Sequence, residues 1–434
     1  MTAYKYPYYL TFFSLLIPFT VNLLKLNYVT LTYVTSLLAL FFIMTMALLY
    51  RRSFYLNNKI IVEFFLLAFY LVAVTSLSLG IGSGGTLIVI FLSLSYFLLF
   101  NSSAPCQNNK TISMLKLLTI MYQLHIIYLY IELILILMGY QHVFVELFSG
   151  KVDFIGYKGY NHAHFLRNLG FDSVTGLGGM LMGSQSASIV SVSAFIFFAM
   201  VKSSLKNSKL WAFLAFGAVL FTSTMTAIAI LLISIFLIVY VYSSSFNTRL
   251  NRILLFLCVP FIIPIIFYKI DRIEEFTTYF SAFMPAIEIF VQNVADENYL
   301  DLLFGFGLVG HNNNAALGIG YGTDFGLMTL INKSGIVLFV LCFIPVLLIN
   351  RRAYIYGKIL FKGKFSNYES NKKLIFNFYT ANVVLMDIWF ISLVHYTNAV
   401  ETGGRELFAL HIALAMYLGR VVRARVENSK YLNV

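Results

Sequence analysis

Apolar residues in this sequence form long continuous runs, separated by short polar segments. Runs of about 20 residues match the length that a helix needs to cross a hydrocarbon core of about 30 Å. Because the runs are apolar throughout and do not alternate with polar residues, they predict helices rather than the strands of a β-barrel. Twelve spans are expected, at about residues 6–24, 28–50, 60–78, 84–100, 117–138, 185–201, 209–222, 225–242, 252–268, 325–349, 374–395 and 404–420.

The predicted fold class is therefore all-α: a polytopic membrane protein of about twelve transmembrane helices, with one domain over residues 1–434. The composition agrees, since 60% of the residues are hydrophobic and 11% are charged. Soluble domains carry about 25% charged residues, so an ordinary soluble domain is excluded. No internal repeat is visible, which weakens an interpretation as a transporter built from inverted repeats.

The formal net charge is +12, and its distribution is more informative than its size. Lysine and arginine gather after every second predicted span and near both termini, where 22 of the 30 lie. Cytoplasmic loops carry such an excess, so both termini are expected in the cytoplasm, and the basic charge gives no reason to expect nucleic acid. The eight cations on the outer side are Lys25, Lys151, Lys158, Arg167, Lys269, Arg272, Lys333 and Arg405.

With this orientation, two long connections face outward, at about residues 139–184 and 269–324. The second begins with "DRIEEFTTYFSAFMPAIEIFVQN", whose apolar residues recur at helical spacing. This pattern predicts an amphipathic helix, which either lies on the membrane surface or packs on the outer end of the bundle. A glycine-rich stretch follows and leads into the tenth span.

The segment "GYNHAHFLRNLGFDS" concentrates ionisable residues in the first outer loop: His162, His164, Arg167 and Asp172. Cations on the outer side need a partner, and a lipid phosphate is one, because arginine grips phosphate through two parallel hydrogen bonds. For most of the outer cations the alternative is pairing with acids of the same loops. Arg167 is the exception, because its surroundings are aromatic and glycine-rich.

A metal site is a weaker interpretation of the two histidines. An H-x-H pair such as His162 and His164 needs a third ligand to bind zinc. Asp172 and His311 are candidates, but no spacing supports them, so we expect no metal. Hydrogen bonds from the histidines to phosphate or hydroxyl groups suit the segment better.

Ionisable residues inside predicted spans are costly in lipid and often functional. His125 and Glu132 are seven residues apart on the fifth span and hence share one face. Asp387 lies in the outer half of the eleventh span. Glu401 and Arg405 are four residues apart, which suits a helical ion pair. These side chains either line the outer end of a cavity or form a buried polar network that fixes helix packing.

Two segments resemble bacterial O-antigen polymerases and ligases (the Wzy and WaaL type). "FLRNLGFDSVTGLGGMLMGSQSASIVSVSAFIFFAM" is similar to their first outer loop and the following helix, with Arg167 and Gly170 at the matching positions. "LLFGFGLVGHNNNAALGIGYGTDFGLMTLINKSGIVLFV" is similar to their second outer loop, where Asp324 opens a helix and His311 resembles the histidine of the ligases. Many relatives carry a Ser-Arg-Thr turn where this chain has "FTSTMTAIAILL", so another cation must take that arginine's role.

The resemblance implies a glycosyltransferase at the outer face of the bacterial cytoplasmic (inner) membrane. It would polymerise undecaprenyl-pyrophosphate-linked oligosaccharide repeat units into an O-antigen or a capsule-type polysaccharide. Fixed cations would stabilise the leaving lipid pyrophosphate, so no nucleotide, metal or other cofactor is expected. The expected substrate-binding residues are Arg167, Arg405, Lys333, Arg272, His162 and His164. The candidate catalytic bases are Asp172, Glu401, Asp324 and His311.

The expected partners are lipid-linked glycans, membrane lipids and a chain-length regulator of the same pathway. An O-antigen ligase, which uses the lipid A core as acceptor, is the alternative within this class. A lipid-linked oligosaccharide flippase is the alternative from another class, and an ordinary secondary transporter is a third. A flippase would hold its cations deep in a two-lobed cavity, whereas arginine and lysine are nearly absent from the middle of the predicted spans.

Overall fold

The computed structural model describes residues 3–23, 38–39, 41–42, 45, 82–102, 107–138, 184–201, 205, 207–222, 230–235, 287–288, 290–304, 326–362, 370–393 and 404–431. Within these residues every regular element is a helix and no strand occurs, which confirms the all-α prediction for this part of the chain. The elements are η1 (Ala3–Lys5), α1 (Tyr6–Leu23), α4 (Gly82–Ser102), α5 (Gln107–Leu137), α8 (Ser184–Met200), α9 (Ser208–Thr222), α13 (Tyr299–Phe304), α16 (Gly326–Lys362), α17 (Ser370–Ser392) and α18 (Gly404–Tyr431).

Several of these helices have the length and apolar character of membrane spans. In the described part of the chain, four are long enough to cross a membrane: Asn109–Leu135, Gly335–Ile355, Leu374–Ser392 and Gly404–Ala424. Shorter apolar helices cover Ile88–Asn101, Ser186–Met200 and Ser208–Thr222. The chain is therefore a helical membrane protein. The number of twelve spans stays a prediction, because four of them lie wholly or mostly outside the described residues: 28–50, 60–78, 225–242 and 252–268.

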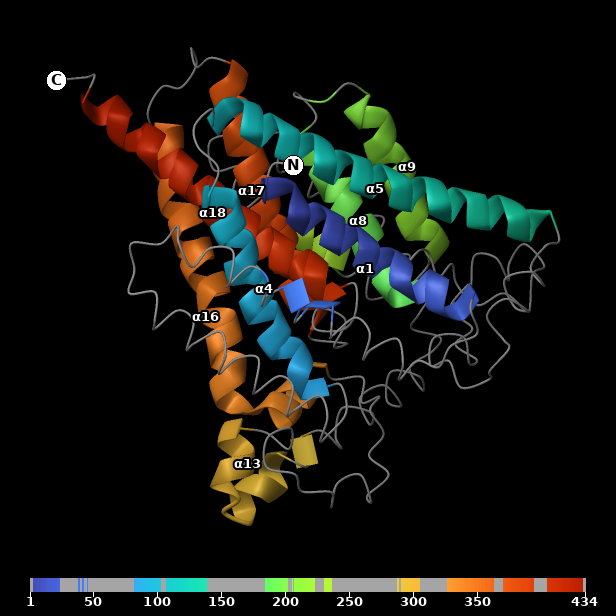
Figure 1. Ribbon diagram of the computed structural model, residues 1–434, viewed down its shortest axis with the longest axis vertical. Helices are drawn as coiled ribbons and strands as arrows, with labels where there is room; N and C mark the ends of the chain where they lie inside the picture. The colour runs from blue at the N-terminus through green and yellow to red at the C-terminus, as the bar shows by residue number, and fades with distance from the viewer. Residues whose placement is uncertain are drawn as a thin grey trace.

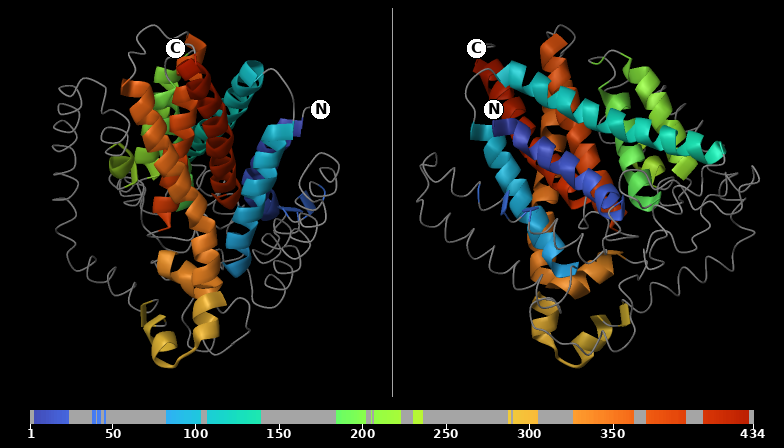
Figure 2. Two further views of the ribbon diagram at one scale, coloured as in Figure 1. Left: turned by 90° about the vertical axis from the view of Figure 1, so that its left-hand side faces the viewer. Right: turned by 45° about the vertical axis from the view of Figure 1, so that its right-hand side comes forward.

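The helices pack into one bundle with a smaller pair beside it (Figure 1, Figure 2). α18 lies against α4, α16 and α17. α8 and α9 pack on each other and both contact α5, and α8 also contacts α17. Large side chains fill the centre of the bundle, where Trp389, Phe408 and Tyr96 are fully buried. In a membrane such packing and polar contacts hold helices together, because lipid is as apolar as the helix surfaces. The bundle encloses the first turn of α18.

α16 is bent at Gly335, where the backbone adopts φ 75° and ψ 163°. Glycine reaches a positive φ without the steric cost that a Cβ would add, so this residue permits the bend. In Figure 1 the short segment before Gly335 runs across the lower end of the longer one. The predicted span over 325–349 is helical from Gly326 onward, with a bend at Gly335 that the sequence pattern did not predict, and Lys333 lies two residues before that bend.

Some helices also extend past the apolar runs that predicted them. α16 continues to Lys362 and α18 to Tyr431, where the apolar runs end at about residues 349 and 420. Arginine and lysine are good helix formers, so a charged segment does not stop a helix. The apolar pattern marks the part of a helix that lipid or protein covers, and not the residue where the backbone ceases to be helical.

Two contacts fix the register between α16 and α17, which run in opposite directions. Asn350 Nδ2 donates a hydrogen bond to Asp387 Oδ1 at 2.6 Å. The ring centroids of Phe343 and Phe390 lie 4.8 Å apart. The acid in the eleventh span therefore has an amide donor from the neighbouring helix, which agrees with a buried polar contact that fixes helix packing.

The second predicted outer loop contains helical structure. Residues 290–295 are helical, which confirms helicity for the end of the expected amphipathic segment, while its earlier part lies outside the described residues. α13 follows and packs against α16. Val291 and Val294 are exposed whereas Asn293 is buried, so this stretch turns apolar side chains outward.

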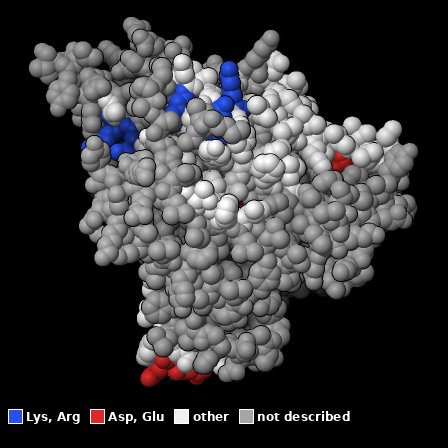
Figure 3. All heavy atoms as spheres, viewed as in Figure 1, with Lys and Arg blue, Asp and Glu red and all other residues white. Residues whose placement is uncertain are grey.

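Charged side chains separate between the two ends of the described structure. Figure 3 shows Lys and Arg gathered at the upper end and a group of Asp and Glu at the lowest point, with a further acidic side chain on the right-hand side. The exposed arginines of α16 and α18 are Arg351, Arg352, Arg420 and Arg423. Asp296 and Glu297 directly precede α13 and are exposed. With the predicted orientation, the upper end would face the cytoplasm; that orientation stays a prediction.

Candidate functional site

Two of the residues predicted for the site lie in the described part of the chain. Arg405 stands in the first turn of α18, and Lys333 stands in the first segment of α16. The first segment of α16 lies at the end of the bundle opposite the exposed arginines, whereas α18 begins nearer the centre of the molecule (Figure 1). The other predicted site residues lie outside the described residues: His162, His164, Arg167, Asp172, Arg272, His311, Asp324 and Glu401.

Arg405 forms an ion pair that is shielded from solvent. Its Nε donates to Oε1 of Glu406 at 2.7 Å, and each side chain is only 1% exposed. Glu406 also lies in the first turn of α18. There the positive end of the helix dipole stabilises a carboxylate. α18 therefore begins with two opposite charges enclosed by the bundle.

Glu406 was not expected as the partner of Arg405. The spacing pointed to Glu401, four residues earlier, because helix neighbours at i and i+4 face each other whereas i and i+1 do not. In the structure Arg405 pairs with Glu406, the next residue along the chain. Glu401 lies outside the described residues, so its expected pair with Arg405 stays a prediction. An acid inside a predicted span was the one signal in the sequence that could have identified Glu406.

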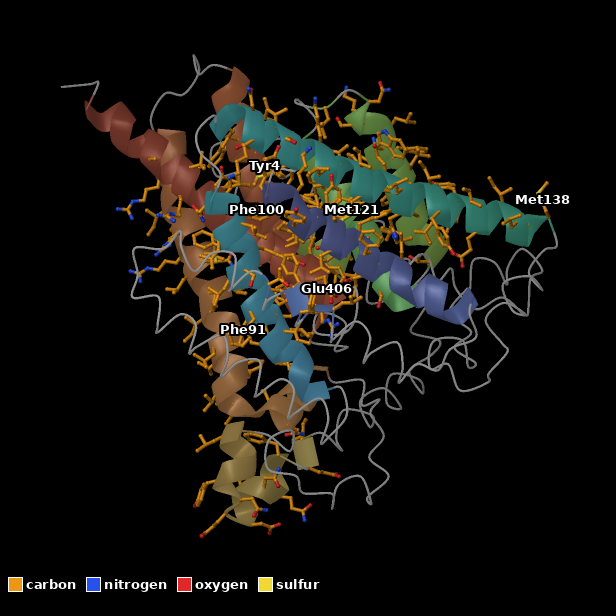
Figure 4. The ribbon with its side chains drawn as sticks, viewed as in Figure 1. Tyr4, Phe91, Phe100, Met121, Met138 and Glu406 are labelled. Atoms are coloured by element: carbon orange, nitrogen blue, oxygen red, sulfur yellow. The ribbon has the colours of Figure 1, made fainter. Side chains whose placement is uncertain are left out.

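The burial of this pair is energetically expensive. Removing an ion from water costs several kcal/mol, and only good geometry between the partners repays it. A buried charge in a helical membrane protein is therefore a candidate functional position. Tyr96 of α4 is fully buried and lies within electrostatic range of both Arg405 and Glu406. Figure 4 shows Glu406 near the centre of the molecule.

A second polar group links three helices deeper along α18. Tyr122 of α5 lies with its hydroxyl 2.8 Å from His411 Nε2 of α18. His411 Nδ1 lies 3.0 Å from Asn382 Oδ1 of α17. The Tyr122 and His411 rings are stacked, with centroids 6.3 Å apart and planes 8° from parallel. All three side chains are buried, so the contacts tie α5, α17 and α18 together.

The hydrogen bonds define the protonation of this group. Asn382 Nδ2 donates to the Phe378 carbonyl at 2.8 Å, which turns Oδ1 toward His411. An amide oxygen can only accept, so His411 Nδ1 carries a hydrogen and donates to Asn382 Oδ1. In the neutral imidazole, Nε2 then accepts from the Tyr122 hydroxyl. Both ring nitrogens are engaged, so the role of His411 in the described structure is to connect helices.

His125 has a packing role as well. Its Nε2 lies 3.2 Å from the Ala187 carbonyl and 3.3 Å from Ser191 Oγ, both on α8. Glu132 shares its face of α5, as predicted, and is also buried. Of the two interpretations that the sequence left open for these residues, the contacts of His125 agree with the polar network that fixes helix packing.

Lys110 is a further buried cation, and groups around its ammonium stabilise the charge. Its Nζ donates to the Phe100 carbonyl near the end of α4. The same ammonium lies 5.6 Å from the Tyr4 ring centroid and 5.0 Å from that of Tyr417. A cation near a helix C-terminus and over aromatic faces is stabilised electrostatically. Lys110 therefore joins η1, α4 and α18 at the upper end.

The chemistry available around the first turn of α18 is therefore a guanidinium paired with a carboxylate, and farther along the helix a set of hydrogen-bonding side chains. Among the described residues, no group of three or more His, Cys, Asp or Glu side chains could hold a metal ion. Comparison of the chain with models of protein families, with curated proteins and with solved structures found no match.

Proposed function

We propose that this membrane protein is a glycosyltransferase that polymerises undecaprenyl-pyrophosphate-linked oligosaccharide repeat units at the outer face of the cytoplasmic membrane. The buried ion pair of Arg405 and Glu406 carries the proposal. Arg405 is one of the cations expected from the sequence to bind the lipid-linked substrate. A guanidinium held in a dry site suits a leaving group that gains negative charge as its bond breaks.

The geometry of the pair supports a positioned cation. Glu406 contacts Arg405 through Nε, which is one of five N–H donors on a guanidinium. That contact holds the planar group in one orientation, and the fork of an arginine matches the oxygens of a phosphate. Preorganised charge of this kind needs no reorganisation during the reaction, which is the main source of electrostatic catalysis.

The proposed reaction balances without a cofactor. The hydroxyl oxygen of the acceptor sugar bonds to the anomeric carbon of the donor glycan, and the bond from that carbon to the pyrophosphate oxygen breaks. The electron pair leaves with undecaprenyl pyrophosphate. The hydroxyl proton passes to a carboxylate or an imidazole, for which the candidates are Asp172, Glu401, Asp324 and His311.

Deletion of the gene in its native host tests the reaction class. Glycans on the carrier lipid and on the cell surface would be separated on a gel. Loss of a polymerase leaves single repeat units on the final acceptor, and loss of a ligase leaves long polymer on the carrier. Loss of a flippase leaves single units facing the cytoplasm. The first pattern, reversed by the wild-type gene, supports the proposal, and either of the others overturns it.

The deletion strain also tests Arg405 directly. Arg405→Lys keeps the charge but loses the two-pronged geometry, so polymer yield should fall about tenfold or more. The matched control is Arg351→Lys, the same exchange at an exposed arginine of α16. It should give the full ladder of glycan chain lengths on the gel. A full ladder from Arg405→Lys at normal protein level would leave the ion pair with a structural role only.

Reporter fusions test the orientation that the proposal needs. Fusions after Lys206 and Lys364 should report the cytoplasm, and fusions after Val152 and Glu297 should report the outside, because the lysines and arginines divide 22 to 8. A cytoplasmic signal after Val152 would place the outer loops on the wrong face of the membrane and overturn the mechanism.

A further inference from the structure

A cavity of about 280 Å³ lies between α4, α16, α17 and α18. Three arginines line it: Arg352 from α16, with Arg420 and Arg423 from α18. Its lining residues on α18 run from Ala415 to Arg423, well beyond Arg405 in the first turn of that helix. It is therefore separate from the site discussed above.

The charge of the cavity is one-sided. Among the described residues that line it there is no aspartate or glutamate. Arg420 rests 5.7 Å from the Phe97 ring centroid and donates to Asn101 Oδ1 at 3.3 Å, a neutral acceptor. Three arginines that line one small space can each donate charge-assisted hydrogen bonds to the oxygens of an anion.

The floor of the cavity is packed and apolar. Tyr379 of α17 is buried there, and Gly419 of α18 faces it. A Cβ at Gly419 would lie 3.3 Å from Cε2 of Tyr379, so glycine lets the helix and the ring lie close together. The cavity has the form of a small-ligand site, with apolar walls and a few convergent polar groups.

An apolar surface adjoins the arginines on the side of α16. Leu348 is 47% exposed and stands four residues before Arg352, so both lie on one face of the helix. α16 runs toward the upper end, which puts Leu348 deeper than Arg352 (Figure 1). A phospholipid of the cytoplasmic leaflet would have this arrangement of headgroup above and acyl chain below.

We propose that this cavity binds a phosphate group on the cytoplasmic side of the membrane, carried by an anionic phospholipid or by a free phosphate ion. Arg352, Arg420 and Arg423 supply charge-assisted hydrogen bonds to its oxygens, and the Phe97 ring supports the Arg420 guanidinium. The site does not depend on the glycosyltransferase function, because it lies at the other end of α18.

Two binding measurements on the full-length protein distinguish the sources. Native mass spectrometry would count phosphatidylglycerol and phosphatidylcholine retained from mixed micelles, and calorimetry would titrate inorganic phosphate into protein in neutral detergent. Retention of phosphatidylglycerol over phosphatidylcholine identifies a lipid headgroup, and phosphate heat without lipid retention identifies a free ion. If neither probe binds the wild-type protein, the proposal is overturned.

Single exchanges to glutamine locate the binding. Arg352→Gln, Arg420→Gln and Arg423→Gln should each weaken binding about tenfold or more, as expected for a lost charged hydrogen bond. Arg351→Gln is the matched control, because Arg351 is equally exposed on α16 but does not line the cavity. An equal loss of binding in Arg351→Gln would show that general surface charge, and not the cavity, attracts the anion, and would overturn the proposal.

Discussion

The two ends of α18 place the same type of residue in opposite environments. At its start Arg405 is buried and paired with Glu406 at 2.7 Å. At its end Arg420 is exposed, and its contact with Asn101 is longer, at 3.3 Å. The start therefore holds a charge that the protein must neutralise internally, whereas the end holds a charge that water and ions can solvate.

The middle of α18 holds polar side chains that are buried or partly buried and make contacts with neutral or aromatic groups. His411 is buried and bonded on both ring nitrogens. Tyr417 provides a face for the Lys110 ammonium. If burial decides how much a polar contact contributes to the free energy of unfolding, substitutions of polar residues should destabilise the protein less from the start of α18 toward its end.

The largest effect is expected for Arg405→Ala. The exchange leaves Glu406 charged in the bundle without its guanidinium partner, and breaking a buried pair costs about 3–5 kcal/mol. Unfolding in mixed detergent micelles, titrated with sodium dodecyl sulfate, would measure the change. The double variant Arg405→Leu with Glu406→Leu removes both charges and should recover most of the loss. A cost below about 1 kcal/mol for Arg405→Ala would show that the pair is solvated.

A smaller effect is expected for His411→Phe. Phenylalanine keeps the stacked ring but removes both hydrogen bonds, which leaves the Tyr122 hydroxyl and the Asn382 oxygen without this partner. The free energy of unfolding should fall by about 1–3 kcal/mol. Tyr122→Phe and the double variant complete a double-mutant cycle in the same detergent titration. Additive costs would mean that the contact between Tyr122 and His411 does not stabilise the fold.

The third largest loss of stability is expected for Lys110→Met. Methionine keeps the apolar length and removes the ammonium that lies over the Tyr4 and Tyr417 rings. Cation–π contacts contribute about 0.5–2 kcal/mol, so the loss should fall in that range. Lys116→Met, at an exposed position of the same helix, is the control and should change stability less. Equal effects at both lysines would show that the aromatic contacts contribute nothing particular.

The smallest effect is expected for Arg420→Gln. Its side chain is exposed and its contact with Asn101 is long, so stability should stay within about 0.5 kcal/mol of wild type. The same detergent titration checks it. A cost as large as that of Arg405→Ala would remove the contrast between the two ends of α18.

The sequence by itself determined where most of the described helices lie. α4, α8, α9 and α17 begin within four residues of their predicted spans, because a long apolar run in a membrane protein has to be helical. It also predicted which helix ends carry the cations, and it singled out Arg405. These features depend on residues close together in the chain, and so a pattern can reveal them.

Only the tertiary structure decided what the polar residues contact. Tyr122 and His411 are 289 residues apart, and no spacing in the chain relates them. Helical periodicity related Arg405 only to Glu401, which lies outside the described residues, and the structure adds Glu406 as a partner in the enclosed first turn of α18. The three arginines of the cavity come from two helices that meet only in the folded bundle. Such contacts depend on which helix faces pack together. The shapes of side chains across the whole bundle decide that packing, and the local hydropathy of a segment contains no information about it.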